Sequence, residues 1–318
     1  MIILSTILEL RDVVKIFSIG VFGRTLIKAV DRVSLTVQRG EILGLLGESG
    51  SGKSTIAKLI LKILKPTSGY ILFKGRDIWK ANDREYYRRV QGVFQDPYAS
   101  FNPRRKVLDI FLDVVRNYYG TVKSGNHEQV LDTVKPVLER VGLSTRDVVD
   151  RYPHEFSGGQ LQRLSIARAL LVKPELIVAD EPVSMVDAST RIDILNIFID
   201  LKEKEGLTSI IIGHDLSLIG YVSDRVVVLY KGQVVEEGPA STLVDPAHPY
   251  TKMLLEAVPR IESKWTKQQS YEVLESLKSS GCVFAPRCPH RMNICTTSDP
   301  PYTNLGKTRV KCWLYAPR

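Results

Sequence analysis

Short apolar runs separated by Gly and Asp turns are the dominant pattern of residues 1–80. The segments VDRVSLTV (30–37), EILGLLG (41–47) and GYILFKG (69–75) follow it, and such runs predict strands, several of them antiparallel. The opening MIILSTILEL is apolar but short, and it reaches Glu9 without a basic start. We interpret it as a first strand rather than a secretion signal.

A helical spacing interrupts these strands in KSTIAKLILKILK, residues 53–65. Its apolar positions fall on one face: Ile56, Leu59, Ile60, Ile63 and Leu64. Apolar residues three and four apart predict an amphipathic helix, and Pro66 is expected to end it. Residues 103–170 are also mostly helical in pattern.

Two later segments, PELIVADEP (174–182) and TSIIIGHD (208–215), are continuously apolar and end in acidic or His residues. This pattern is typical of strands that are buried on both faces of a parallel sheet and that deliver polar side chains at their C-terminal ends. The Pro-rich DPAHPY at 245–250 is expected to mark a boundary. The chain is therefore predicted to be an α/β protein with a smaller C-terminal region.

The segment GESGSGKS, Gly47 to Ser54, fits the phosphate-binding pattern G-x-x-x-x-G-K-[ST] and lies between a predicted strand and a predicted helix. Its glycines let successive N–H groups point at phosphate oxygens, and the helix N-terminus adds its dipole. Lys53 is expected to reach the β- and γ-phosphates, and Ser54 to hold Mg²⁺. These residues predict a site for a nucleoside triphosphate.

Two adjacent carboxylates complement this loop. Asp180 ends a predicted buried strand, and Glu181 follows it. Asp180 is expected to support Mg²⁺ directly or through water, and Glu181 to polarise the attacking water. A second Gly-rich turn, Ser157–Gly159 in FSGGQ, precedes another predicted helix. Since one phosphate-binding loop already suffices, this turn needs a ligand of its own or of another molecule.

The order of these motifs over residues 1–240 resembles that of the ATP-binding cassette (ABC) ATPases. FSGGQ is similar to the signature motif of this family, with Phe156 in place of the usual Leu, and GVFQDP carries the Q-loop glutamine, Gln95. SMVD resembles the D-loop and ends at Asp187, although the more usual motif is Ser-Ala-Leu-Asp. GHD carries the switch histidine, His214.

The resemblance implies a P-loop NTPase with a RecA-like parallel core, an antiparallel β subdomain and a helical subdomain at about 97–170. It also implies that two cassettes dimerise head to tail around ATP and Mg²⁺, so that each signature turn caps the γ-phosphate held by the other chain. Glu181 and His214 are the implied catalytic residues, and Phe17, with Phe22 nearby, is the best candidate to stack on adenine. The implied Mg²⁺ ligands are Ser54, Gln95 and Asp180. The implied nucleotide contacts are Phe17, Gly47, Ser49, Gly50, Gly52, Lys53, Ser54, Thr55, Gln95, Ser157, Gly158, Gly159, Gln160 and Asp187.

The subfamily is indicated by VFQDPYASFNPRR and by DPAHPYTKMLLEAVP. Both resemble the ATPases of oligopeptide and dipeptide importers, whose C-terminal region begins at His-Pro-Tyr, 248–250. This resemblance implies a cassette at 1–243, an extension at 244–318 and ATP-driven import of peptides. It also implies a heterodimer with another ATPase, of which this chain resembles the second type, two membrane permeases and an extracellular solute-binding protein. The implied location is the cytoplasmic side of the cell membrane, and import of oligosaccharides or nickel remains an alternative.

The composition indicates a compartment and a rival function. Hydrophobic residues make up 44% and charged residues 25% of the chain, and no apolar run is long enough to cross a bilayer. We therefore expect a globular, cytosolic protein. The net charge of +9 could favour nucleic acid, anionic lipid or an acidic partner. A soluble ABC ATPase acting on nucleic acid is thus the rival class, but a single cassette without long inserted arms favours transport, and no nucleic-acid partner is expected.

All four cysteines lie near the C-terminal end: Cys282, Cys288, Cys295 and Cys312. Five, six and sixteen residues separate them, which is not the paired C-x₂-C spacing of most structural zinc sites. The tail resembles the cysteine-containing extension of peptide-importer ATPases, in which a [4Fe–4S] cluster occurs. We expect such a cluster to crosslink the tail. Zinc is the second alternative, and unliganded thiols or disulfides also remain open.

Overall fold

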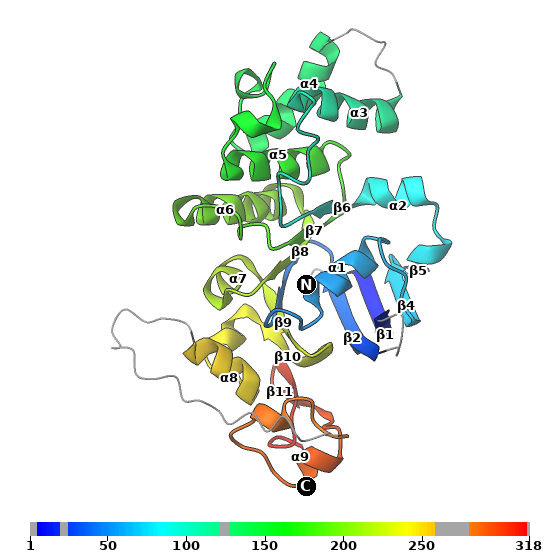
Figure 1. The fold of residues 1–318 in the computed structure, drawn as a ribbon, viewed down its shortest axis with the longest axis vertical. Coiled ribbons are helices and arrows are strands. Elements are labelled where there is room, and N and C mark those ends of the chain that lie inside the picture. The colour runs from blue at the N-terminus through cyan, green and yellow to red at the C-terminus, as the bar shows by residue number, and fades with distance from the viewer. Residues whose placement is uncertain (1–4, 20–24, 121–126, 258–279, 317–318) are drawn as a thin grey trace.

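The computed structural model describes residues 5–19, 25–120, 127–257 and 280–316, and Figure 1 shows their arrangement. The strands are β1 (Thr6–Ile19), β2 (Thr25–Gln38), β3 (Ile42–Leu46), β4 (Ser68–Phe73), β5 (Arg76–Asp77), β6 (Val90–Val93), β7 (Leu176–Asp180), β8 (Thr208–Gly213), β9 (Arg225–Tyr230), β10 (Gln233–Pro239), β11 (Tyr302–Leu305) and β12 (Thr308–Lys311). The α-helices are α1 (Lys53–Ile60), α2 (Asp83–Arg89), α3 (Val107–Tyr119), α4 (His127–Arg140), α5 (Gly158–Leu170), α6 (Ala188–Glu205), α7 (Leu216–Val222), α8 (Pro249–Glu256) and α9 (Ile294–Thr297). Single 3₁₀ turns are η1 (Ile78–Lys80), η2 (Thr145–Asp147), η3 (Pro153–Glu155), η4 (Ala240–Leu243) and η5 (Ala285–Arg287).

The larger sheet has its strands in the order β11-β12-β10-β9-β3-β8-β7-β6. Its centre is parallel, because β3 pairs with β8 and β9, and β7 pairs with β6 and β8. Every residue of β3 and β8 is buried, as predicted for continuously apolar strands. Along β7, Ile177 and Ala179 pack into one core with α5, α6 and α7, whereas Leu176 and Val178 pack into a second core with α1, β1 and β2. Both faces of this sheet are therefore covered.

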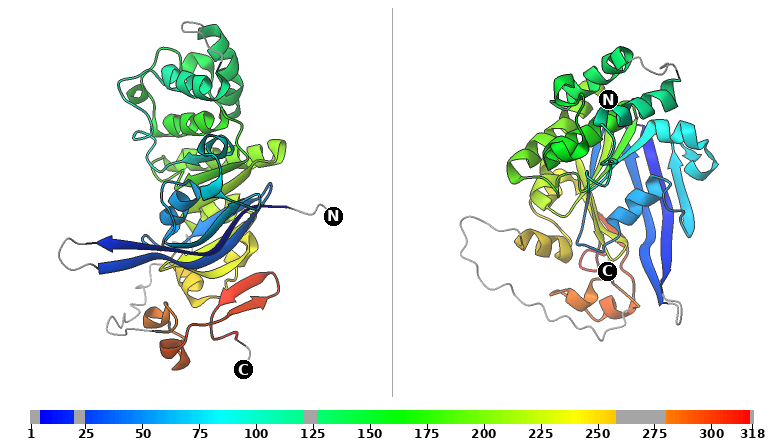
Figure 2. Two further views of the ribbon diagram at one scale, coloured as in Figure 1. Left: turned by 90° about the vertical axis from the view of Figure 1, so that its right-hand side faces the viewer. Right: turned by 45° about the horizontal axis from the view of Figure 1, so that its top comes forward.

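The smaller sheet has the antiparallel order β2-β1-β4-β5. It confirms the antiparallel strands predicted at the start of the chain, although residues 1–4 lie outside the described part. Figure 2 shows β1 and β2 as a long hairpin that projects from the body of the molecule. The run at 41–47 does not join this sheet, because its strand β3 lies at the centre of the parallel one.

The predicted helix at 53–65 is shorter than expected. α1 ends at Ile60, before Pro66 is reached. Lys62 adopts a left-handed backbone with φ 55°, and the amides of Ile63 and Leu64 both donate to the Lys58 carbonyl oxygen. This turn at the end of the helix points Ile63 outward, and its side chain is 54% exposed. The prediction that Ile63 lies on the buried face of the helix was therefore wrong. The local turn, which the apolar spacing does not encode, decides the difference.

Helices α3, α4 and α5 gather at one end of the molecule (Figure 1). They confirm the mostly helical pattern predicted for 103–170. Phe111 of α3, Val134 of α4 and Leu164 of α5 are fully buried in a core that continues into α6 and the parallel sheet. The helical region is thus joined to the sheet by continuous apolar packing.

The C-terminal residues complete the larger sheet. β12 pairs antiparallel with β10, where Val310 lies opposite Glu236, and β11 pairs with β12. The Pro-rich segment that was expected to mark a boundary begins α8, with His248 as its N-cap, and Tyr250 is fully buried. The C-terminal extension is therefore packed on the rest of the protein. The division into a domain at 1–243 and an extension at 244–318 stays a prediction. Among the described helices, none combines the length and apolar character that a membrane span requires.

Candidate functional site

The loop from Gly47 to Ser54 connects β3 to α1 through a tightly bent backbone. Gly47 and Gly52 have φ values of 152° and 104°, a region that residues with side chains rarely adopt. A Cβ atom at Gly47 would lie 2.3 Å from the Leu229 carbonyl oxygen, and one at Gly52 would lie 2.3 Å from that of Ala29. Conformation and space therefore both require glycine at these two positions.

Lys53 is buried beneath this loop and is 5% exposed. Its Nζ donates to the carbonyl oxygens of Gly47 and Glu48 over 2.7 and 2.9 Å. Burial lowers the pKa of Lys53, and the carboxylates of Glu181 and Asp180 oppose that shift. The loop thus holds a cation among bent backbone groups, an arrangement that suits polyphosphate. The other predicted contacts of this segment lie in the loop or in the first turn of α1: Ser49, Gly50 and Thr55.

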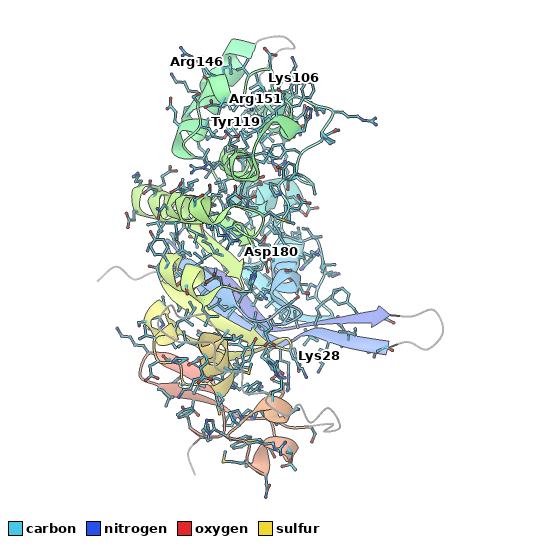
Figure 3. The ribbon with its side chains drawn as sticks, turned by 60° about the vertical axis from the view of Figure 1, so that its left-hand side comes forward. Lys28, Lys106, Tyr119, Arg146, Arg151 and Asp180 are labelled. Atoms are coloured by element: carbon cyan, nitrogen blue, oxygen red, sulfur yellow. The ribbon has the colours of Figure 1, made fainter. Side chains whose placement is uncertain are left out.

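Asp180 and Ser54 are brought together from the end of β7 and the start of α1. Ser54 Oγ donates to Asp180 Oδ1 over 3.1 Å. Burial raises the pKa of Asp180, the Ser54 hydrogen bond lowers it, and the neighbouring Glu181 raises it. Figure 3 shows Asp180 between the helical end of the molecule and the β1–β2 hairpin. A hydroxyl and a carboxylate are oxygen donors of the kind that Mg²⁺ prefers, so this pair fits the implied ion.

The Glu181 side chain, which follows β7, is contacted by residues that follow two neighbouring strands. Gln95, which follows β6, donates from Nε2 to Glu181 Oε2 over 3.3 Å, and Nδ1 of His214, which follows β8, lies 3.3 Å from Glu181 Oε1. Parallel strands bring their carboxyl ends to one edge, which explains how these distant segments converge. The Glu181 backbone is left-handed, with φ 48°. Such strained conformations concentrate at functional sites.

The signature segment begins α5. Ser157 N donates to Gln160 Oε1 over 3.0 Å, and Gln160 N donates to Ser157 Oγ over 3.3 Å, which forms a capping box. The helix starts at Gly158, so the two glycines are its first residues, whereas the sequence predicted a turn before it. A Cβ atom at Gly158 would lie 2.9 Å from the Met185 carbonyl oxygen. The signature therefore packs closely on the segment that resembles the D-loop.

The remaining predicted nucleotide contacts lie on β1, at the start of α5 and at the N-cap of α6. Among the described residues, no hydrogen bond joins Ser157–Gln160 to that loop. Asp187 is the N-cap of α6, and its side chain makes no capping hydrogen bond. Phe17 is half-buried on β1, with Lys15 Nζ 5.2 Å from its ring centroid, and Phe22 lies outside the described residues. Adenine stacking on Phe17 stays a prediction.

The four cysteines converge although they are far apart in sequence. Cys282, Cys288, Cys295 and Cys312 line one small cavity, together with His290, and no disulfide joins these four cysteines. Burial raises the pKa values of Cys288 and Cys312 to about 11. Within the described ranges, no group of three or more His, Cys, Asp or Glu side chains was found that could hold a metal ion.

Comparisons with known proteins agree with this geometry. The family model described as ABC transporter matches residues 30–184, and the model for the oligopeptide/dipeptide transporter C-terminal region matches residues 235–295. A putative peptide import ATP-binding protein of Brucella abortus is 44% identical over 98% of this chain and 95% of its own. The oligopeptide transport ATP-binding protein AppF of Bacillus subtilis is 42% identical over 98% of each chain. The chain belongs to the ABC transporter family.

Solved structures of ABC cassettes share the fold of this ABC ATPase. A dimeric, post-hydrolysis cassette bound to ADP and Pi is 28% identical, with a TM-score of 0.63 over 73% of this chain and 98% of its own. An ABC transporter cassette in its ADP conformation is 29% identical, with a TM-score of 0.65 over 80% of this chain and 100% of its own. The predicted P-loop NTPase fold and the ATPase activity are confirmed by these relationships.

Sequence reasoning missed the residues of this ABC ATPase that contact the P-loop from the extension. Tyr250 and Arg287 both bind Glu48, the second residue of the P-loop. Tyr250 was noted only as part of a family marker. No local sequence signal identifies Arg287 or Glu48, because their pairing depends on how the extension packs on the cassette.

Proposed function

We propose that this ABC ATPase powers the import of peptides through a membrane transporter. The observation that carries the proposal is the match of residues 235–295 to the oligopeptide/dipeptide transporter C-terminal region. Relatives named for peptide import align with almost the whole chain. An intact P-loop, Glu181 and His214 accompany that region, so the chain carries the residue types that ATP hydrolysis needs.

In this proposal the nucleotide site acts mainly by positioning and charge. Lys53 and the P-loop amides bind the β- and γ-phosphates. Ser54 and Asp180 would hold Mg²⁺, which supplies neutralisation of the phosphate charge. Glu181 orients the attacking water and accepts its proton. His214, which is 3.3 Å from Glu181, contacts the γ-phosphate and keeps that carboxylate in place.

The signature segment supports a composite site made by two chains. Its polar groups bond within the segment and not to the P-loop of the same chain, which leaves the N-terminus of α5 for the nucleotide of a partner. We propose that the partner is a second, different ATPase, and that each signature caps the γ-phosphate bound by the other chain. Two permeases and an extracellular solute-binding protein complete this transporter. The chain then lies on the cytoplasmic side of the cell membrane.

Glu181→Gln tests this function in a transporter reconstituted with its permeases in liposomes. The variant should bind ATP normally, hydrolyse it about 10²- to 10⁴-fold more slowly and stop taking up labelled peptides. Glu203→Gln, which changes an exposed carboxylate on α6, is the matched control and should keep both activities. Wild-type turnover in Glu181→Gln would contradict the assigned role. Uptake of oligosaccharides or nickel instead of peptides, or ATPase stimulation by nucleic acid instead of permeases, would replace the proposed function.

For the cysteines, we propose a [4Fe–4S] cluster. Four cysteine thiolates are the usual ligands of such a cluster, whereas the spacing of these cysteines differs from the paired C-x₂-C of most structural zinc sites. The convergence of Cys282, Cys288, Cys295 and Cys312 on one cavity, with no disulfide among them, supports a centre that all four cysteines share. A visible spectrum and an iron assay on anaerobically purified protein test it. Colourless, iron-free and zinc-loaded protein would contradict it.

A further inference from the structure

The loop between Cys282 and Cys288 reaches the P-loop directly. Arg287 Nη1 donates to Glu48 Oε2 over 2.7 Å, and Arg287 Nη2 donates to Glu48 Oε1 over 2.9 Å. The pair is two-pronged and half-buried, with side-chain exposures of 26% and 37%. Such planar pairs fix orientation as well as charge. The contact joins residues 239 positions apart in the chain.

All the polar groups of Glu48 are engaged. Its amide donates to Tyr250 Oη over 2.8 Å, its carbonyl oxygen accepts from Lys53 Nζ over 2.9 Å, and its carboxylate is held by Arg287. Two of these three contacts come from the C-terminal extension. The third comes from the lysine that binds phosphate in the proposed mechanism. Glu48 therefore links the extension to the phosphate-binding lysine.

The arginine is held in place by an aromatic cluster. Its Cζ lies 5.8 Å from the Tyr230 ring centroid, and the rings of Tyr230, Tyr250 and Phe284 are 4.6 to 5.5 Å apart. Phe284 is fully buried and lies in the same cysteine-flanked loop as Arg287. The loop thus carries both the apolar anchor and the charged contact, and Cys288 follows the arginine directly. We therefore expect a displacement of Cys288 to move Arg287.

We propose that Arg287 and Tyr250 are positioning residues of the nucleotide site, and that they transmit the state of the four-cysteine site to the P-loop. The proposal rests on the proposed ATP binding. Glu48 places a negative charge in a loop that binds an anionic triphosphate, and Arg287 neutralises it. When the cysteine-flanked loop is displaced, the carboxylate is left unpaired beside the phosphates, and ATP affinity falls. The cysteine site would then control nucleotide binding without contacting nucleotide.

A double-mutant cycle tests the first step on the purified full chain, with a fluorescent ATP analogue and Mg²⁺. Arg287→Met should raise the Kd about three- to tenfold. In a Glu48→Gln background the same change should alter the Kd less than about twofold, because no charge remains to neutralise. Arg309→Met is the matched control and should leave the Kd unchanged, since Arg309 also lies in the extension, is 34% exposed and pairs with Glu237 of β10. An unchanged Kd in Arg287→Met, or an equal shift in both backgrounds, overturns the proposal.

Tyr250→Phe keeps the buried ring and removes only the hydroxyl, so it provides a second test if Arg287→Met folds poorly. It should raise KM for ATP while kcat stays near wild type, because Glu181 and His214 are untouched. A change in stability with no change in KM overturns the positioning role of Tyr250.

Cys288→Ser tests the transmission. Cys288→Ser should raise the Kd for the ATP analogue when Arg287 is present. In a chain that already carries Arg287→Met, it should cause no further increase in this Kd. An equal increase in both backgrounds overturns the link between the cysteine site and the P-loop. A wild-type chain that binds no ATP would overturn the proposed function itself. If the wild type binds ATP normally but the variants give the contradicting results described above, only this inference is overturned.

Discussion

Acidification is expected to destabilise the protein through His248, the N-cap of α8. This side chain is 1% exposed, and its Nδ1 accepts a hydrogen bond from the Tyr250 amide over 3.1 Å. Its ring centroid lies 5.7 Å from that of Phe284. A proton on Nδ1 would remove the acceptor that the Tyr250 amide needs and would place a charge in an apolar cluster.

The size of the effect follows from the pKa of His248, which burial lowers from 6.5 to about 4. Between these values the unfolded chain binds more protons than the folded chain, so stability is complete above pH 6.5 and falls as the pH drops through this window. One pKa unit corresponds to about 1.4 kcal/mol. The whole shift is then worth about 3.4 kcal/mol, of which about 2 kcal/mol is lost by pH 5.

Urea unfolding followed by circular dichroism, at pH 7.5 and pH 5, measures this loss. His248→Asn is the matched control, because Asn is a good N-cap acceptor that does not titrate. Burial also raises the pKa of the nearby Glu236, but this group is present in both proteins and its contribution cancels in the comparison. The wild type should lose about 2 kcal/mol more than the variant. Equal losses would refute the reasoning.

Three further changes test the core and the nucleotide site. Phe284→Ala should lower the free energy of unfolding by about 3 to 5 kcal/mol. The control Val244→Ala, at a residue that is 82% exposed, should change the free energy of unfolding by less than about 0.5 kcal/mol. Similar losses in Phe284→Ala and Val244→Ala would show that the aromatic cluster does not stabilise the fold. Ser54→Ala should raise the Mg²⁺ concentration for half-maximal ATPase activity about ten- to a hundredfold, and an unchanged titration would exclude Ser54 as a ligand. Lys53→Met should weaken ATP binding about tenfold or more, as measured with a fluorescent ATP analogue. Wild-type affinity in this variant would disprove the role of Lys53.

Much of the parallel core was predictable because its signals are local. Continuous apolar runs predicted the buried strands β7 and β8, and the polar residues after them predicted one functional edge. Gln95, Glu181 and His214 meet at that edge, since the carboxyl ends of parallel strands lie side by side. The glycines of the P-loop were equally readable, because their backbone conformation is a property of the residue itself.

The sequence by itself determined the phosphate-binding loop, the buried strands and the family, since each depends on residues that are adjacent or regularly spaced. Only the tertiary structure decided that the four cysteines share a cavity, that Ile63 faces solvent and that Arg287 binds Glu48. These features join segments distant in the chain or depend on one local turn. A pairing across 239 positions leaves no periodic trace, because it exists only after the extension packs on β9 and β10.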